Sequence, residues 1–174
     1  MLKYTCASCG KEHESWPAIG FDAPYHYYNL TDEEKHAIAE LSSDFCTIRY
    51  DDQTDHFIRA VLFQNVNDHC EDLQYGVWVS LSEKSFHVYK DNFHNDNHEA
   101  TYFGYLSSWL PGYDDTTSIK TNVVLSPGGN RPEVIPHMEQ VDHPFLADYF
   151  NGISIEIVCK ENKIGVRRID NCPI

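Results

Sequence analysis

Three closely spaced segments rich in β-branched and aromatic residues constrain the fold more than any other feature of this sequence. They are residues 45–50, 56–66 and 75–81. Such side chains favour the pleated, half-buried surface of a sheet. Two further segments, 118–125 and 133–138, flank a stretch rich in proline and glycine and are typical of a hairpin. The sequence therefore predicts a mostly antiparallel sheet.

Residues 101–110 are interpreted as one more strand of this sheet. Some strand residues are too apolar to be left exposed together, and we expect them in the core. They are Phe57, Val61, Val77, Val79, Leu81 and Phe103.

Good N-cap residues begin three predicted helices, which cover about residues 31–43, 82–93 and 142–152. Thr31, Ser82 and Asp142 can each accept a hydrogen bond from the free amides of the first turn, and Glu34 completes a capping box with Thr31. Two or three helices with a mostly antiparallel sheet make an α+β fold.

The length of 174 residues suits one domain. We expect a single α+β domain over residues 1–174. It comprises a candidate metal-knuckle segment (1–28), a core (29–153) and a variable tail (154–174).

The charge of the chain restricts its partners. The chain carries 27 acidic and 13 basic side chains, a formal net charge of −14. Residues 1–100 alone hold 18 acidic and 7 basic residues. A field of this sign repels nucleic acid phosphates and anionic lipid, so neither is expected as a partner. It would attract a basic protein, although such charge also serves solubility alone.

The sequence also predicts where the chain resides. No apolar run approaches the ~18 residues of a membrane span, and the first residues lack the pattern of a secretory signal peptide. Without such a signal, the six cysteines are expected to be free thiols or metal ligands rather than disulfides. The predicted location is therefore the cytoplasm.

A pair of cysteines near the amino terminus predicts a metal site. Cys6 and Cys9 are separated by two residues and followed by Gly10. Two thiolates at this spacing on a tight turn can bind one ion, and zinc then needs two more Cys or His ligands. His13 and Cys46 are the predicted third and fourth ligands, which makes zinc the candidate cofactor. Two reduced cysteines in a turn, or a redox dithiol, are the alternatives.

Arg59 interrupts an apolar strand. Because burying a cation alone is costly, Arg59 either pairs with a carboxylate such as Asp44 or lines a cleft. The second alternative defines a candidate ligand cleft, which consists of Arg59, Trp78, Lys120, Arg131 and His143. The sequence holds no Gly-x-Ser-x-Gly and no His-Glu-x-x-His motif, so catalytic residues stay unassigned.

Several short motifs occur in an order that points to a known family. Among them are Tyr4-x-Cys6-x2-Cys9-Gly10-x2-His13, Ser43-Asp44-x-Cys46-x-Ile48, Gly76-Val77-Trp78-Val79-Ser80-Leu81-Ser82 and Asp142-His143-Pro144. From about residue 3 to 153 the chain resembles the bacterial family named domain of unknown function two-one-nine-nine. That family carries no assigned activity. The resemblance implies a bacterial cytosolic protein and supports treating Cys6, Cys9, His13 and Cys46 as one group.

Together these features predict an uncharacterised bacterial cytosolic protein that acts by binding rather than by catalysis and holds a structural zinc knuckle. One alternative is an acidic immunity-type protein that neutralises a basic toxin partner. The other is an enzyme or small-ligand binder that uses a cleft near Arg59, Arg131 and His143.

Overall fold

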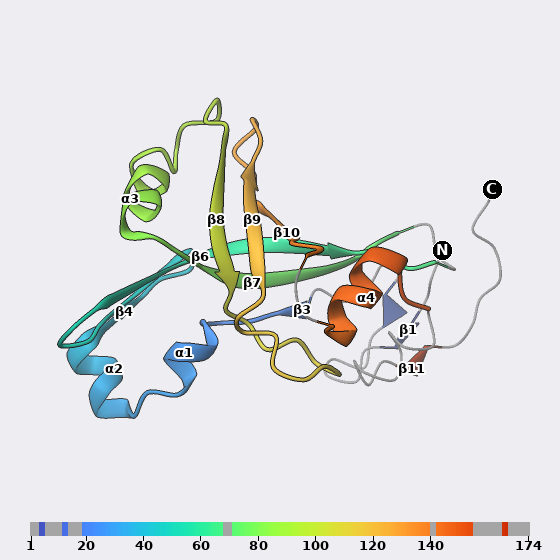
Figure 1. The fold of residues 1–174 in the computed structure, drawn as a ribbon, viewed down its shortest axis with the longest axis horizontal. Coiled ribbons are helices and arrows are strands. Elements are labelled where there is room, and N and C mark those ends of the chain that lie inside the picture. The colour runs from blue at the N-terminus through green and yellow to red at the C-terminus, as the bar shows by residue number, and fades with distance from the viewer. Residues whose placement is uncertain are drawn as a thin grey trace.

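Two long strands, β6 (Thr54–Gln64) and β7 (Leu73–Leu81), form the centre of the fold (Figure 1). They pair antiparallel from His56 opposite Leu81 to Gln64 opposite Leu73. The computed structural model describes residues 19–67, 71–139 and 142–154, and beyond these only the backbone of three two-residue strands.

The helices are α1 (Tyr25–Tyr28), α2 (Asp32–Ile38), α3 (Glu83–Asp91) and α4 (Pro144–Asn151). The other strands are β1 (Tyr4–Thr5), β2 (Glu12–His13), β3 (Ile19–Gly20), β4 (Ala39–Leu41), β5 (Phe45–Arg49), β8 (Ala100–Leu106), β9 (Lys120–Leu125), β10 (Glu133–Pro136) and β11 (Gly165–Val166).

Five strands close into a barrel. Their order is β7-β8-β9-β10-β6, and the pairing of β6 with β7 completes the ring. β10 runs parallel to β6, whereas the other neighbours in the ring are antiparallel. β3 adds to β7, and β5 and β4 extend the sheet from β6. The α+β prediction is confirmed, and most neighbouring strands are antiparallel as predicted. The sheet is not a simple antiparallel one, however, because it contains two parallel pairings and closes into a barrel with extra strands.

The length of β6 explains why the sheet closes. On one edge, its first five residues pair with β5, and further along Val61 pairs with Glu133 of β10. Its other edge pairs with β7. Apolar alternation predicts each strand, but it carries no information about which strand edges meet.

Alternate residues of the barrel strands fill its interior, because successive side chains of a strand point to opposite faces. Each strand contributes fully buried residues to this cluster, among them Ile58, Val79, Leu106, Val123 and Val134. Phe57 and Trp78 face the opposite side and pack with Cys46, Ile48 and Leu30 in a second cluster.

Four of the six predicted core residues are buried: Phe57, Val77, Val79 and Leu81. Val61 is half-buried, and the prediction for Phe103 is wrong because its side chain is 49% exposed. In β8 the pleat directs Gly104 and Leu106 inward, so that Phe103 and Tyr105 lie on the outer face.

The described residues contain four helices rather than the two or three predicted. The capping box of Thr31 with Glu34 is confirmed, but α2 ends at Ile38 because the following residues pair with β5 as β4. The N-cap of α4 is His143, whose Nδ1 accepts a hydrogen bond from the backbone of Phe145, rather than Asp142.

Figure 1 shows α3 and α4 on opposite sides of the barrel, with α2 beside β4. No helix in the described ranges is long and apolar enough to cross a membrane. In the predicted knuckle segment (1–28), residues 1–18 lie outside the described residues apart from the backbone of β1 and β2, and so does the tail after residue 154 apart from the backbone of β11.

We predict that Ile58→Ala lowers the free energy of unfolding by about 2–5 kcal/mol, because the removed methylene groups leave a cavity inside the barrel. The matched control is Ile135→Ala in β10, where the side chain is 37% exposed and the loss should stay below about 1 kcal/mol. Urea denaturation of both variants measures the difference. Equal losses would contradict the closed barrel.

Candidate metal centre

Helix α3 places a carboxylate and an imidazole on one of its faces. Glu83 and His87 are four residues apart, a spacing that aligns side chains along a helix. Ser82 is the N-cap of the helix, and its hydroxyl accepts a hydrogen bond from the Ser85 amide at 3.2 Å. Glu83 lies in the first turn, where the helix dipole favours negative charge.

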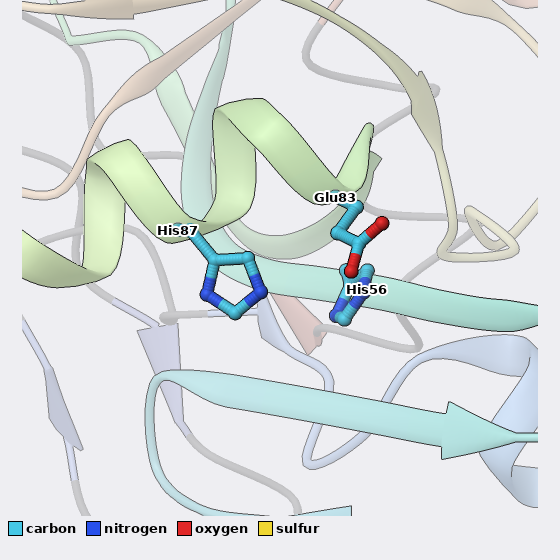
Figure 2. A group of neighbouring side chains, drawn as sticks. All are labelled: His56, Glu83 and His87. Carbon is cyan, nitrogen blue, oxygen red and sulfur yellow. The ribbon is translucent and has the colours of Figure 1, made fainter.

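Strand β6 supplies a second imidazole. The ring of His56 stacks on the ring of Phe86 with 4.5 Å between centroids, which fixes it beneath α3. Figure 2 shows Glu83 and His87 projecting from α3 toward His56. One potential ligand atom from each of these three residues lies within 4.8 Å of the other two.

His56 is a buried histidine without a hydrogen-bond partner in the described part of the chain. Its side chain is 7% exposed, and neither ring nitrogen has a hydrogen-bond partner among the described residues. Buried polar atoms without a partner are uncommon and costly. Burial lowers the pKa of His56, and the nearby His87 lowers it further, whereas Glu83 opposes the shift. The neutral imidazole, which is the form that binds metal, is therefore favoured.

Two imidazoles and one carboxylate suit a divalent transition metal. This donor set occurs in catalytic zinc sites and in non-haem iron sites, where solvent or substrate takes the remaining positions. Ligand atoms at ~2.1 Å from a tetrahedral ion lie about 3.4 Å apart, so binding must draw the three side chains closer together. Glu83 and His87 are exposed and can make that adjustment, while His56 is held by its packing.

A cavity with a volume of about 630 Å³ lies beside this group, and both His56 and Glu83 line it. That volume is in the usual range for small-molecule sites. Its walls come from α1, the start of β6, the end of β7, the first turn of α3, β8 and the 107–118 segment. Among the lining residues are Asp55, Ser80, Phe103, Tyr105, Ser107 and Ser118.

Of the five residues of the predicted cleft, Arg59 and Trp78 are in contact, and the charges of Arg59 and Arg131 both act on Asp44. Arg59 and Trp78 are opposite each other on β6 and β7, with the guanidinium carbon 6.0 Å from the centroid of the indole. Trp78 is fully buried, and its indole N–H donates to the backbone carbonyl of Phe21. Lys120 lies on β9, and His143 caps α4.

Asp44, the carboxylate proposed for Arg59, forms its ion pair with Arg131. The Nε and Nη2 groups of Arg131 donate to Asp44 Oδ1 at 3.0 and 2.8 Å. Burial alone would raise the pKa of Asp44, but the hydrogen bonds from Ser43 and Arg131 hold it below its usual range. The hairpin loop before β10 is thereby tied to the start of β5, and Arg59 has no ion pair among the residues described.

Of the predicted zinc quartet, the structure describes the side chain of Cys46 alone. Cys46 is fully buried in the second apolar cluster, and burial raises the pKa of its thiol to about 12. Such surroundings favour the protonated thiol over the thiolate that metals bind. Cys6, Cys9 and the side chain of His13 lie outside the described residues, so the quartet stays a prediction.

Sequence reasoning missed the group of His56, Glu83 and His87. A usable signal was present on α3, since a carboxylate and a histidine four residues apart share one face of a predicted helix. The third member could not be found in this way. His56 comes from a strand, and only the pairing of β6 with β7 brings it beneath the helix.

Comparison with known proteins identifies the family. A family of uncharacterised proteins conserved in bacteria, DUF2199, matches residues 5–153, and the chain belongs to it. No curated protein and no solved structure matches the chain.

The lowered pKa of His56 predicts how stability varies with pH. Because the folded state disfavours protonation of His56, the unfolded chain binds more protons once the pH falls to about 6.5. Unfolding free energy should therefore fall as the pH drops from about 7 toward 5. In His56→Phe this decline should be shallower. Urea denaturation across that range, in low salt without metal, measures the slopes.

The control for this prediction is His36→Gln, which removes an exposed histidine from α2. Identical slopes in the wild-type protein and in His56→Phe would show that His56 does not titrate differently on folding.

Proposed function

We propose that this member of the DUF2199 family is a metal-binding protein that holds one divalent transition metal ion on His56, Glu83 and His87. The observation that carries the proposal is the convergence of three ligand atoms within 4.8 Å around a buried histidine whose ring nitrogens have no partner in the described structure. An ion would satisfy one of those nitrogens and offset the cost of burying it.

The composition of the site favours zinc, ferrous iron, nickel or copper over magnesium and calcium. Imidazole nitrogen is a ligand of the first group, whereas the hard cations prefer oxygen atoms alone. With three protein ligands the ion keeps at least one open position. Both His56 and Glu83 border the cavity, so that position is accessible to a small molecule.

The mode of action in this proposal is metal-dependent binding of a ligand in the cavity. It agrees with the prediction from the sequence that the protein acts by binding. A zinc knuckle on Cys6 and Cys9 would be a second, independent metal site. A basic toxin as partner and a cytoplasmic location stay predictions that rest on charge and composition.

We predict that the full-length protein binds one Co²⁺ or Zn²⁺ ion at this centre. The double variant His56→Ala/His87→Ala should bind it at least about 100-fold more weakly, because a single carboxylate ligand remains. Isothermal titration gives the affinity, and the d–d absorption of bound Co²⁺ reports a nitrogen and oxygen environment. The matched control is His94→Ala/His98→Ala, which removes two histidines from the loop after α3 and should leave affinity unchanged.

The same measurement separates the two metal sites. Cobalt bound to Cys6 and Cys9 would add a sulfur-to-metal charge-transfer band that Cys6→Ser/Cys9→Ser removes. The proposal fails if the His56→Ala/His87→Ala protein binds cobalt as the wild-type protein does, or if all bound cobalt shows the sulfur band.

A further inference from the structure

We infer that the cavity beside the metal centre binds a small organic monoanion, whose anionic oxygen coordinates the metal and whose uncharged body lies against the hydroxyl and aromatic side chains of the walls. This inference rests on the proposed metal site. It adds the chemical class of the ligand, which follows from the charges and the surface of the cavity.

The charge balance of the site sets the charge of the ligand. A divalent ion on two neutral imidazoles and the Glu83 carboxylate leaves a net charge of about +1. One anionic oxygen at the open position neutralises it. Among the described residues that line the cavity there is no lysine and no arginine, and there is a second carboxylate, Asp55. A further negative charge on the ligand would therefore meet Asp55 and no cation on the lining. The charge of Arg49 reaches His56, but Arg49 is already paired with Glu40 at 3.1 Å.

Apart from Asp55, the walls away from the metal are polar but uncharged. Ser80, Ser107 and Ser118 line them, together with Thr117 and Tyr105. Two of these hydroxyl groups already form hydrogen bonds within the protein. Ser80 Oγ accepts from the Tyr105 amide, and Ser107 Oγ donates to the Tyr105 carbonyl. Hydroxyl groups can either donate or accept, so they fit the oxygen and nitrogen atoms of a neutral ligand body.

Two aromatic rings at the cavity supply apolar contact. Phe103 and Tyr105 stand edge to face with 5.1 Å between ring centroids, and they are 49% and 42% exposed. The ring of His26, from α1, stacks on the ring of Phe57 with 5.3 Å between centroids, and both residues line the same cavity. A flat ligand body would bury part of the exposed surface of Phe103 and Tyr105, which favours binding.

The inference is tested with hydroxamates, which bind metals as monoanions through two oxygens. Full-length protein loaded with Co²⁺ is titrated with benzohydroxamate and with acetohydroxamate, and the cobalt absorption is followed. We predict at least about tenfold tighter binding of benzohydroxamate, because its ring contacts the cavity walls. Phe103→Ser should remove most of that preference and change acetohydroxamate affinity by less than about twofold. The control Phe63→Ser alters an exposed phenylalanine of β6 outside the cavity and should change neither affinity.

A second pair of measurements tests whether the site disfavours a second negative charge on the ligand. 4-Carboxybenzohydroxamate carries one more negative charge than benzohydroxamate and should bind about tenfold more weakly. Asp55→Asn should reduce that penalty, because it removes the one carboxylate besides Glu83 among the described lining residues, while cobalt affinity stays unchanged.

The outcomes distinguish this inference from the metal site itself. Equal affinities for the three hydroxamates, no effect of Phe103→Ser, or hydroxamate binding without cobalt would overturn the ligand class and leave the metal site standing. Failure of the protein to bind cobalt at His56, Glu83 and His87 would overturn both.

Discussion

The antiparallel pairing of β6 with β7 is the interaction on which the rest of the structure depends. It gives the barrel its two longest strands, and it is also the pairing that closes the ring. Its opposite faces supply the two apolar clusters, with Ile58 and Val79 inside the barrel and Phe57 and Trp78 outside. Weakening this ladder would therefore disturb both clusters and the closure at once.

The candidate metal centre is a local product of the same ladder. His56 pairs with Leu81, the last residue of β7, and Ser82 then begins α3 directly. The helix must return over the end of the ladder, and its first two turns carry Glu83 and then His87 past the ring of His56. Phe86, from the same turn, stacks on that ring and holds it. One short connection thus assembles all three donors, and their spacing depends on little else in the chain.

The sequence predicted local features well because they depend on local chemistry. The strands at 45–49, 54–64 and 73–81, the hairpin of β9 with β10 and the capping box of Thr31 were all foreseeable from residue type and spacing. Closure was not foreseeable, because it depends on the parallel contact between Glu133 and Val61, which are far apart in the chain. The exposure of Phe103 was missed because the sequence does not show which face of β8 points into the barrel. The position of His56 beneath α3 was missed because it depends on the register of β6 with β7. The pairing of Asp44 with Arg131 likewise depends on a long-range contact, because it forms only when the loop between β9 and β10 reaches the start of β5.

Closure of the ring has a further consequence for how copies of the chain meet in a crowded solution. An open sheet ends in strands whose free amides and carbonyls can recruit another chain. In the eight-stranded sheet of this protein those ends are β3 and β4, with two and three residues, too short to template a stable intermolecular ladder. The two longest strands, β6 and β7, have partner strands on both edges. Detachment of β10 would uncover backbone of β6 and β9 together, so this four-residue strand protects the protein against self-association as well as completing its fold.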